Sequence, residues 1–198
     1  MNASLLTHTE LVYRAHPTLE AFAGWPRDIR PQPVTPLSRP AHDLMLHDNA
    51  LRSARYPDLL HAILRAGDHV HWRETYKTGA LNTDFMARWG CFAVIGEGAP
   101  YRSDHLRLFV VYMPAGLYYP PHRHPAEETY LVVAGQAVFK RSGAPDTLLG
   151  EGDTAFHPSQ QPHALQTTHS PVLCLVAWRN HLDVPPELLD ESALLTAV

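Results

Sequence analysis

Between about residue 85 and residue 180 the chain consists of short β-branched and aromatic runs separated by glycine, proline and aspartate. Runs of this kind are typical of short strands joined by tight turns. We place strands at residues 91–95, 106–113, 129–134, 136–140, 154–156 and 172–178. Six or more short strands at close spacing predict a small antiparallel β-barrel or jelly roll, so the expected fold is mainly β.

The residues before this region have a different pattern, which predicts helices. Apolar positions recur over residues 10–22 and 41–55, and a third apolar segment follows Pro57 and ends at Gly67. Proline in the first turn and glycine just past the end are favoured helix positions. Five prolines between residues 26 and 40 predict a loop, because proline cannot continue a helix.

These two patterns predict one domain with an appendage. A chain of 198 residues is long enough for one substantial core and short for two. We expect residues 1–84 to form an N-terminal helical extension packed on the barrel. Residues 85–180 would form the barrel itself, and residues 181–198 a C-terminal segment.

Charge and composition exclude several classes of protein. The formal net charge of −4 leaves no global positive field, so nucleic acid is not an expected partner. No run of about 20 apolar residues predicts a membrane span, and the N-terminus lacks a leader pattern, so we expect a cytoplasmic protein. Cys91 and Cys174 both lie in apolar runs and are expected to be buried and reduced.

Fourteen histidines are many for this length, so their spacing decides which could bind a metal. On a strand, His122 and His124 point to the same side with Cα atoms roughly 6.5 Å apart. Glu128 and Tyr130 have the same parity and would return to that side if the chain stays in register. Imidazole nitrogens and a carboxylate that converge inside a barrel predict a site for Zn²⁺, Fe²⁺, Mn²⁺ or another divalent ion.

A second stretch, residues 150–166, contains another histidine after a Gly-Asp turn and a short strand. This residue, His163, can complete the cluster only if the fold brings the two stretches together. His157 lies between Phe156 and Pro158, out of phase with the expected strand face. We therefore expect His157 to be structural or exposed.

Together the two stretches resemble the motifs of the cupin superfamily. The first has Gly, five residues, His-x-His, three residues, Glu, six residues and Gly, from Gly116 to Gly135, which matches every fixed position. The second departs at Gln160, where the family usually has Gly, and at Thr167, where it often has Asn. It matches at Gly152, Pro158 and His163. The resemblance covers about residues 85–180 and implies a single cupin barrel with one divalent metal ion.

A longer signature resembles the cupin-type dimethylsulfoniopropionate (DMSP) lyases. It comprises Tyr-Tyr-Pro-Pro-His-Arg-His-Pro-Ala-Glu-Glu-Thr-Tyr at residues 118–130, Trp-Arg-Glu-Thr-Tyr at 72–76, and a helical half of this length. The resemblance implies metal ligands, which fall here on His124, Glu128 and His163, with His122 as an additional or alternative ligand. It also implies functional tyrosines, which fall here on Tyr119 and Tyr130. The helical half would cover the barrel mouth or form a dimer surface, so we expect structural roles for Trp72, Arg73 and Tyr76.

The resemblance implies cleavage of DMSP to dimethyl sulfide and acrylate, a carbon–sulfur lyase reaction. A divalent ion on the substrate carboxylate would offset the charge that develops as the α C–H bond breaks. We prefer Tyr130 as the base, because a nearby dication favours its phenolate, and Tyr119 as a substrate-positioning hydroxyl. Aromatic rings attract a sulfonium by cation–π interaction, for which Tyr119 and Trp178 are candidates.

Two other functions stay open. A dioxygenase would use Fe²⁺ held by the same kind of ligand set, and a sensor would use the metal only to hold a ligand. Two tyrosines beside a carboxylate-binding metal favour elimination. The expected protein is therefore a lyase with one divalent ion, Zn²⁺ or Fe²⁺ before Mn²⁺. It would act on a small carboxylate–sulfonium substrate, without membrane or nucleic-acid partners, and a homodimer is a candidate assembly.

Overall fold

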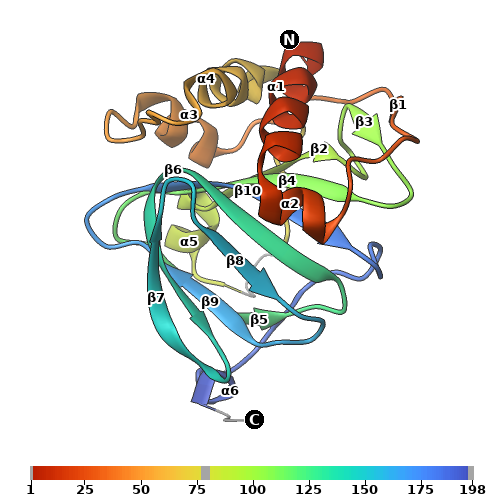
Figure 1. Ribbon diagram of the computed structural model, residues 1–198. Helices are drawn as coiled ribbons and strands as arrows, with labels where there is room; N and C mark the ends of the chain where they lie inside the picture. The colour runs from red at the N-terminus through yellow and green to blue at the C-terminus, as the bar shows by residue number, and fades with distance from the viewer. Residues whose placement is uncertain (1, 77–80, 196–198) are drawn as a thin grey trace.

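The computed structural model describes residues 2–76 and 81–195, and it contains a β-barrel with helices over one side (Figure 1). The N-terminal helices are α1 (Asn2–Ala15), α2 (Pro17–Phe22), α3 (Pro40–His47) and α4 (Pro57–Ala66), followed by the 3-10 turn η1 (Gly67–His69) and α5 (Thr83–Arg88). The last helix is α6 (Ser192–Leu195). No helix in the described part of the chain is long and apolar enough to cross a membrane.

The strands confirm the expected mainly β fold. In chain order they are β1 (Arg30–Pro31), β2 (Gly90–Ile95), β3 (Tyr101–Arg102), β4 (Arg107–Met113), β5 (Tyr118–Arg123), β6 (Glu127–Arg141), β7 (Ala144–Gly150), β8 (Thr154–His157), β9 (His163–Gln166), β10 (Val172–Arg179) and β11 (Glu187–Leu188). Their order in the sheet is β1-β3-β2-β4-β10-β6-β9-β5-β11, with β7 and β8 also paired to β6.

Two of the predicted helical segments differ from the structure. A break at His16 divides residues 10–22 into α1 and α2, because a residue before proline disfavours the helical conformation. The helix predicted over residues 41–55 is wrong beyond His47. Asp48 ends it: the Asp48 carboxylate accepts hydrogen bonds from the Ala50 amide at 3.1 Å and from the Tyr112 hydroxyl at 2.8 Å.

A single long strand, β6, replaces the two strands predicted at residues 129–134 and 136–140. Its first half pairs with β10 and β8, and its second half pairs with β7 and β9. The change of partners falls at Gly135, which has φ +72°. A Cβ there would lie 1.9 Å from the Pro171 carbonyl oxygen, so only glycine allows this close approach. One strand therefore joins both sides of the barrel.

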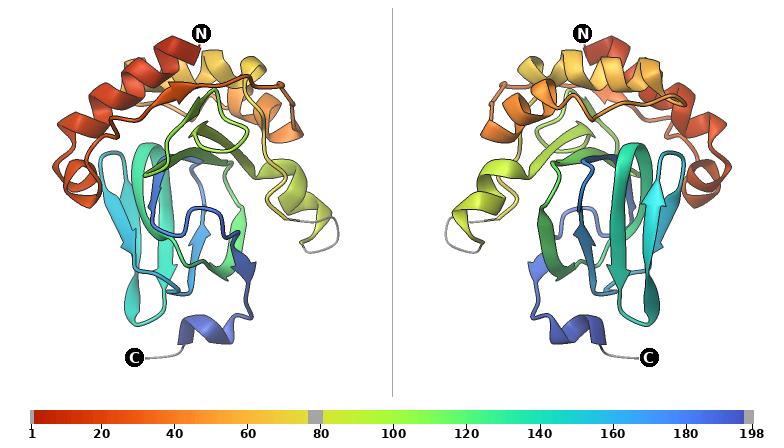
Figure 2. Two further views of the ribbon diagram at one scale, coloured as in Figure 1. Left: turned by 90° about the vertical axis from the view of Figure 1, so that its right-hand side faces the viewer. Right: turned by 90° about the vertical axis from the view of Figure 1, so that its left-hand side faces the viewer.

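Alternate residues of β6 belong to two separate cores. Leu131 and Val133 pack in a cluster with residues of the N-terminal helices, whereas Tyr130 and Val132 pack in the barrel interior. The helices arch over the outer face of the sheet, as the two side views show (Figure 2). Both cysteines are free and buried, as predicted.

Extension and barrel share one sheet as well as one core. Strand β1, inside the expected extension, pairs with β3 of the barrel. The boundary expected after residue 84 falls inside α5. The division of the chain into extension, barrel and C-terminal segment stays a prediction, and residues 77–80 and 196–198 of those segments lie outside the described residues.

The two departures from the cupin pattern have local explanations. Gln160 adopts φ +64°, a conformation that glycine takes most readily, and its amide donates to the His124 carbonyl at 2.9 Å. The Thr167 hydroxyl donates to the Pro114 carbonyl at 2.6 Å and accepts from the Leu117 amide at 2.9 Å. The turn between the motifs is therefore kept, with a strained glutamine and a bridging threonine.

Replacing Gln160 by glycine should stabilise the protein. A non-glycine residue at positive φ costs about 1–2 kcal/mol, part of which glycine loses again through its freer unfolded chain. Gln160→Gly should therefore raise the free energy of unfolding in urea by up to about 1 kcal/mol. Ser159→Gly is the matched control: it is also exposed, lacks a positive φ, and should lower that free energy by about 0.4–1 kcal/mol. Equal losses in both variants would contradict the strain at Gln160.

Candidate metal centre

Strand pairing brings the predicted site residues together from distant parts of the chain. His122 on β5 is the Cα partner of His163 on β9. Glu128 on β6 is the partner of Trp178 on β10 on one side and of His157 on β8 on the other. All five side chains are at most 8% exposed. The register of three strand pairs thus brings these side chains together, and the buried His124, just after β5, completes one cluster with them.

Three residues of this cluster could hold a metal ion: His124, Glu128 and His163 each offer a ligand atom within 4.8 Å of the others. The Glu128 carboxylate oxygen Oε2 lies 3.1 Å from Nε2 of His163 and 3.5 Å from Nε2 of His124. The grouping agrees with the set expected from the resemblance. Glu127, the neighbour of Glu128, faces outward and pairs with Arg179 at 2.9 Å.

Backbone carbonyls fix which nitrogen of each ring faces the cluster. Nδ1 of His124 lies 2.9 Å from the Ala126 carbonyl oxygen, and Nδ1 of His163 lies 2.8 Å from that of Gln161. A carbonyl can only accept, so each Nδ1 must carry a proton, and in the neutral ring each Nε2 presents a lone pair. A ring held in this way is the usual arrangement of a metal-binding histidine.

The cluster has the unsatisfied atoms that a cation would bind. Nε2 of His124, Nε2 of His163 and Oε2 of Glu128 are buried and have no hydrogen-bond partner among the described residues. Buried polar atoms without partners are costly, and here two lone pairs and a carboxylate oxygen converge. One divalent ion with nitrogen and oxygen ligands satisfies all three atoms, so the residues fit such an ion.

His122 lies beside the three residues. Its ring centroid is 4.1 Å from that of His163 and 6.3 Å from that of His124, and its Nδ1 lies 3.0 Å from the Pro120 carbonyl oxygen. Burial, together with the neighbouring His163, holds the pKa of His122 well below its ordinary value. The ring is therefore neutral, which is the form that binds a metal. Its role as an additional or alternative ligand stays a prediction.

Trp178 holds the carboxylate of the cluster. Its indole Nε1–H donates to Oε1 of Glu128 at 2.6 Å, which leaves Oε2 directed at the two histidines. The indole ring also lies 4.2 Å from the His124 ring, centroid to centroid. Trp178 was predicted only as an aromatic wall for the substrate; the hydrogen bond gives it a second contact, to a candidate ligand.

His157 was expected to be structural or exposed, and out of phase with the strand face; the exposed alternative and the phase are wrong, whereas a structural role stays a prediction. It is 1% exposed and stacks on His163, with ring centroids 4.1 Å apart and planes 14° apart. The error lies in the parity of β8, since the apolar Phe156 was expected to face inward. Phe156 is instead 41% exposed and packs against Phe22 of α2. The sequence offered one signal: Ala155 and His157 are two residues apart, so they share one face of the strand, and the small Ala155 could mark it as the inner face.

Both predicted tyrosines reach the same cluster. Tyr130 is buried and makes edge contacts with His157 and Phe139. The ring of Tyr119 stacks on His122 at 4.1 Å, and its hydroxyl oxygen lies 2.6 Å from that of Tyr76. Burial raises the pKa of both Tyr119 and Tyr130 well above the ordinary value, so both phenols are protonated in the protein alone.

A small cavity of about 50 Å³ opens beside the cluster. Glu128, His124, His122, Tyr119 and Tyr130 line one part of it. The rest is mostly apolar or aromatic, and the sequence had pointed only to Trp178 among its residues. The remaining lining residues are Arg73, Thr75, Trp89, Cys91, Phe109, Val111, Trp178 and Pro186.

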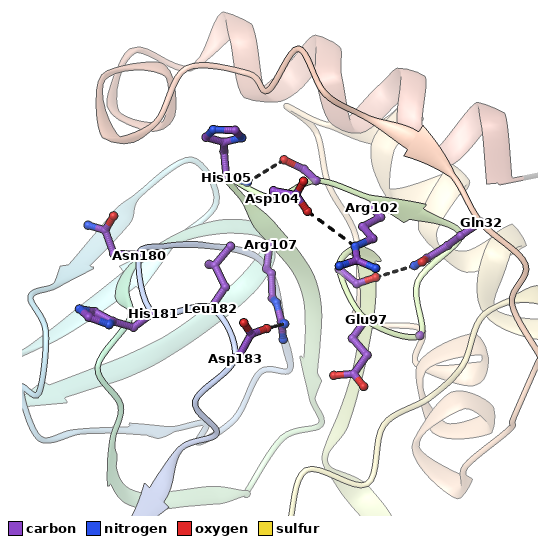
Figure 3. A pocket seen from close by; sticks show the side chains of 13 residues that line it. Gln32, Glu97, Arg102, Asp104, His105, Arg107, Asn180, His181, Leu182 and Asp183 are labelled. Atoms are coloured by element: carbon purple, nitrogen blue, oxygen red, sulfur yellow. Dashed lines mark hydrogen bonds and ion pairs between the residues drawn. The ribbon is translucent and has the colours of Figure 1, made fainter.

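A larger groove of about 690 Å³ lies elsewhere and shares no lining residue with this cavity (Figure 3). Its polar groups largely satisfy one another. Arg107 pairs with Asp183, and the Gln32 side chain donates to the Gly96 carbonyl at 2.7 Å. Without converging unpaired groups it gives no chemistry, so the candidate site is the smaller cavity.

The fold and the site define a class of protein: a cupin barrel with a buried cluster that could hold one metal ion. The sequence matches the dimethylsulfoniopropionate lyase family over residues 30–174. The chain therefore belongs to the dimethylsulfoniopropionate lyase family.

Individual relatives agree with this assignment over nearly the whole chain. Dimethylsulfoniopropionate lyase DddQ of Ruegeria pomeroyi strain DSS-3 is 45% identical over 185 residues, 93% of this chain and 92% of the relative. The crystal structure of DddQ from R. pomeroyi DSS-3 has a TM-score of 0.92 at 44% identity, covering 94% and 95% of the two chains. A chain from the crystal structures of the DMSP lyases RdDddP and RnDddQII has a TM-score of 0.91 at 35% identity, covering 96% and 97%.

Trp178→Phe should weaken metal binding. The change removes the donor to Oε1 of Glu128 and leaves that oxygen buried without a partner. The loss of such a contact to a metal ligand typically lowers metal affinity by about 10–100-fold. Titration against a chromophoric chelator would measure it. Trp89→Phe is the matched control, because Trp89 lines the same cavity but its Nε1 has no partner among the described residues. His163→Ala should lower metal content most; equal affinity in all four proteins would refute the assignment.

Proposed function

We propose that this protein is a metal-dependent DMSP lyase that forms dimethyl sulfide and acrylate. The observation that carries the proposal is that three unpartnered ligand atoms meet beside a cavity that is lined by two tyrosines. Family membership supports it, since the relatives named above are DMSP lyases. His124, Glu128 and His163 would hold the ion, with His122 beside them.

When bound, a divalent ion would offset the negative charge that develops on the substrate carboxylate as the α C–H bond breaks. Tyr130, as its phenolate, would take the α proton. The electron pair of that C–H bond would form the new C=C bond while the C–S bond breaks, and dimethyl sulfide would leave as a neutral molecule. Acrylate remains, and Tyr130 returns its proton to solvent.

The environment of Tyr130 links its basicity to the charge of the cluster. Burial raises the pKa of Tyr130 most, and the negative charge of Glu128 is the next cause. A cation held by Glu128 would cancel that second cause and attract the phenolate. Tyr130 would therefore act as a base only in the metal-loaded protein.

The aromatic lining suits the other end of the substrate. Trp89, Phe109, Tyr119 and Trp178 all line the cavity. A sulfonium makes no conventional hydrogen bond, and aromatic faces attract a cation by roughly 0.5–2 kcal/mol. The cavity of about 50 Å³ is close to the space of one or two water molecules, so side chains at its mouth must move to admit the substrate.

The proposal also covers the identity of the metal ion, the location of the protein and its assembly. Zn²⁺ and Fe²⁺ are the preferred ions because imidazole suits both, and Mn²⁺ is third because it prefers oxygen ligands. A cytoplasmic location is proposed from the sequence. A homodimer stays a prediction.

Purified, metal-loaded protein should release dimethyl sulfide from DMSP, with one acrylate per dimethyl sulfide. Headspace gas chromatography and liquid chromatography of acrylate measure the two products. The rate should be the same under air and under nitrogen, because elimination consumes no oxygen. Strict dependence on O₂ would move the protein to the dioxygenase class, and metal-dependent DMSP binding without any product would make it a sensor.

Tyr130→Phe should lower kcat by about 10²–10⁴-fold, because it removes the proposed base. Metal content and DMSP binding should change little, since the ring remains. Tyr119→Phe should act mainly on KM, because the proposed role of its hydroxyl is to position the substrate. Steady-state kinetics of both variants, normalised to metal content, provide the measurement.

The same pair of variants shows whether Tyr119 is the base instead of Tyr130, or whether neither tyrosine is. Loss of turnover in Tyr119→Phe with a nearly active Tyr130→Phe would exchange the two roles. Full activity in both variants would exclude a tyrosine base.

A further inference from the structure

Tyr76 belongs to the N-terminal extension, yet its side chain enters the barrel interior. The segment before it is held against β2: Trp72 forms a β-bridge with Phe92, and the Arg73 amide donates to the Cys91 carbonyl at 2.7 Å. The Trp72 ring is fully buried and packs edge-on against Phe92 at 5.0 Å. These contacts fix where Tyr76 enters the core.

The Tyr76 hydroxyl meets one polar group, the Tyr119 hydroxyl, at 2.6 Å. It makes no other hydrogen bond within the described residues, and the side chain is 6% exposed. Tyr119 lines the cavity beside the metal cluster, whereas Tyr76 does not. Tyr76 therefore lies behind Tyr119 as seen from the substrate.

The position of the two phenols decides which one donates. A tyrosine carries its proton at neutral pH, since its ordinary pKa is about 10, so two O–H groups share one contact. If Tyr119 donated, the Tyr76 proton would be buried without a partner, which is costly. If Tyr76 donates, its proton is satisfied and the Tyr119 proton is free to point into the cavity. The second arrangement satisfies both groups once a ligand binds.

We infer that Tyr76 is a positioning residue, which donates to Tyr119 and directs the Tyr119 O–H toward the carboxylate of the substrate. The inference rests on the proposed function of the cavity. A hydrogen bond received by Tyr119 strengthens the one that Tyr119 donates, because linked hydrogen bonds polarise one another. The extension thereby completes the site inside the barrel.

A purely structural role for Tyr76 predicts a different outcome. The ring of Tyr76 packs near Trp89 and Tyr119, with centroids 6.4 and 6.1 Å away. Tyr76→Phe keeps this packing and removes only the hydroxyl. If Tyr76 merely fills space, that variant should bind and turn over substrate like the wild type.

The test is a double-mutant cycle of Tyr76→Phe and Tyr119→Phe in the metal-loaded full chain. We measure KM and kcat for DMSP and, separately, the dissociation constant of propionate, a carboxylate without the sulfonium, by calorimetry. Tyr76→Phe alone should raise KM and weaken propionate binding roughly three- to tenfold, the effect of one hydrogen bond, with kcat nearly unchanged. In the Tyr119→Phe background the same change should have no further effect.

Tyr118→Phe is the control, since the Tyr118 hydroxyl donates to Glu191 on the exposed side at 2.9 Å. It should match the wild type in both assays. Wild-type behaviour of Tyr76→Phe, or the same loss in both backgrounds, would overturn the inference. If the wild type releases no dimethyl sulfide, the proposed function fails, while the propionate cycle still decides whether Tyr76 acts through Tyr119.

Discussion

The hydrogen bonds from Nδ1 of His124 and His163 to nearby backbone carbonyls determine what the cavity can do. They turn both Nε2 lone pairs toward Oε2 of Glu128, which Trp178 holds from the other side. This convergence exists only in one strand register. A slip of β6 by one residue would bring Glu127 inward and carry Glu128 to the outer face. The pairing of β6 with β8 and β10 therefore matters to the chemistry as much as to the fold.

Regular alternation explains why much of the site could be predicted from the sequence. The parity of His122, Glu128 and Tyr130 along extended chain already places them on one face, and the cupin motif spacing adds His163. The inward position of His157 was not predicted, because its neighbour Phe156 is apolar and yet exposed. Hydrophobicity therefore indicated the wrong face of β8. The strand β7 was not predicted because it is mostly exposed and its sequence has no alternation of apolar and polar residues.

Other parts could not be predicted because tertiary contacts decide them. The helix after Pro40 stops at His47, where Asp48 bonds to Tyr112 on β4, a residue 64 positions away. Arg73 and Thr75 reach the cavity from a segment without helical or strand periodicity, held by its contacts to β2. The signature at residues 72–76 marked this segment, but only the fold shows that it lies against the barrel interior.

The alternation along β6 has a consequence for how such a protein can change. Tyr130 and Leu131 are neighbours in the chain, yet one contacts the cavity and the other contacts the helical cover. The side chains of the two sets pack against different neighbours. Side-chain changes at the inner positions therefore act first on the cavity, and changes at the outer positions act first on the packing of the helices. Within its fifteen residues, β6 thus contributes one wall of the cavity and one face of the helix-covered core.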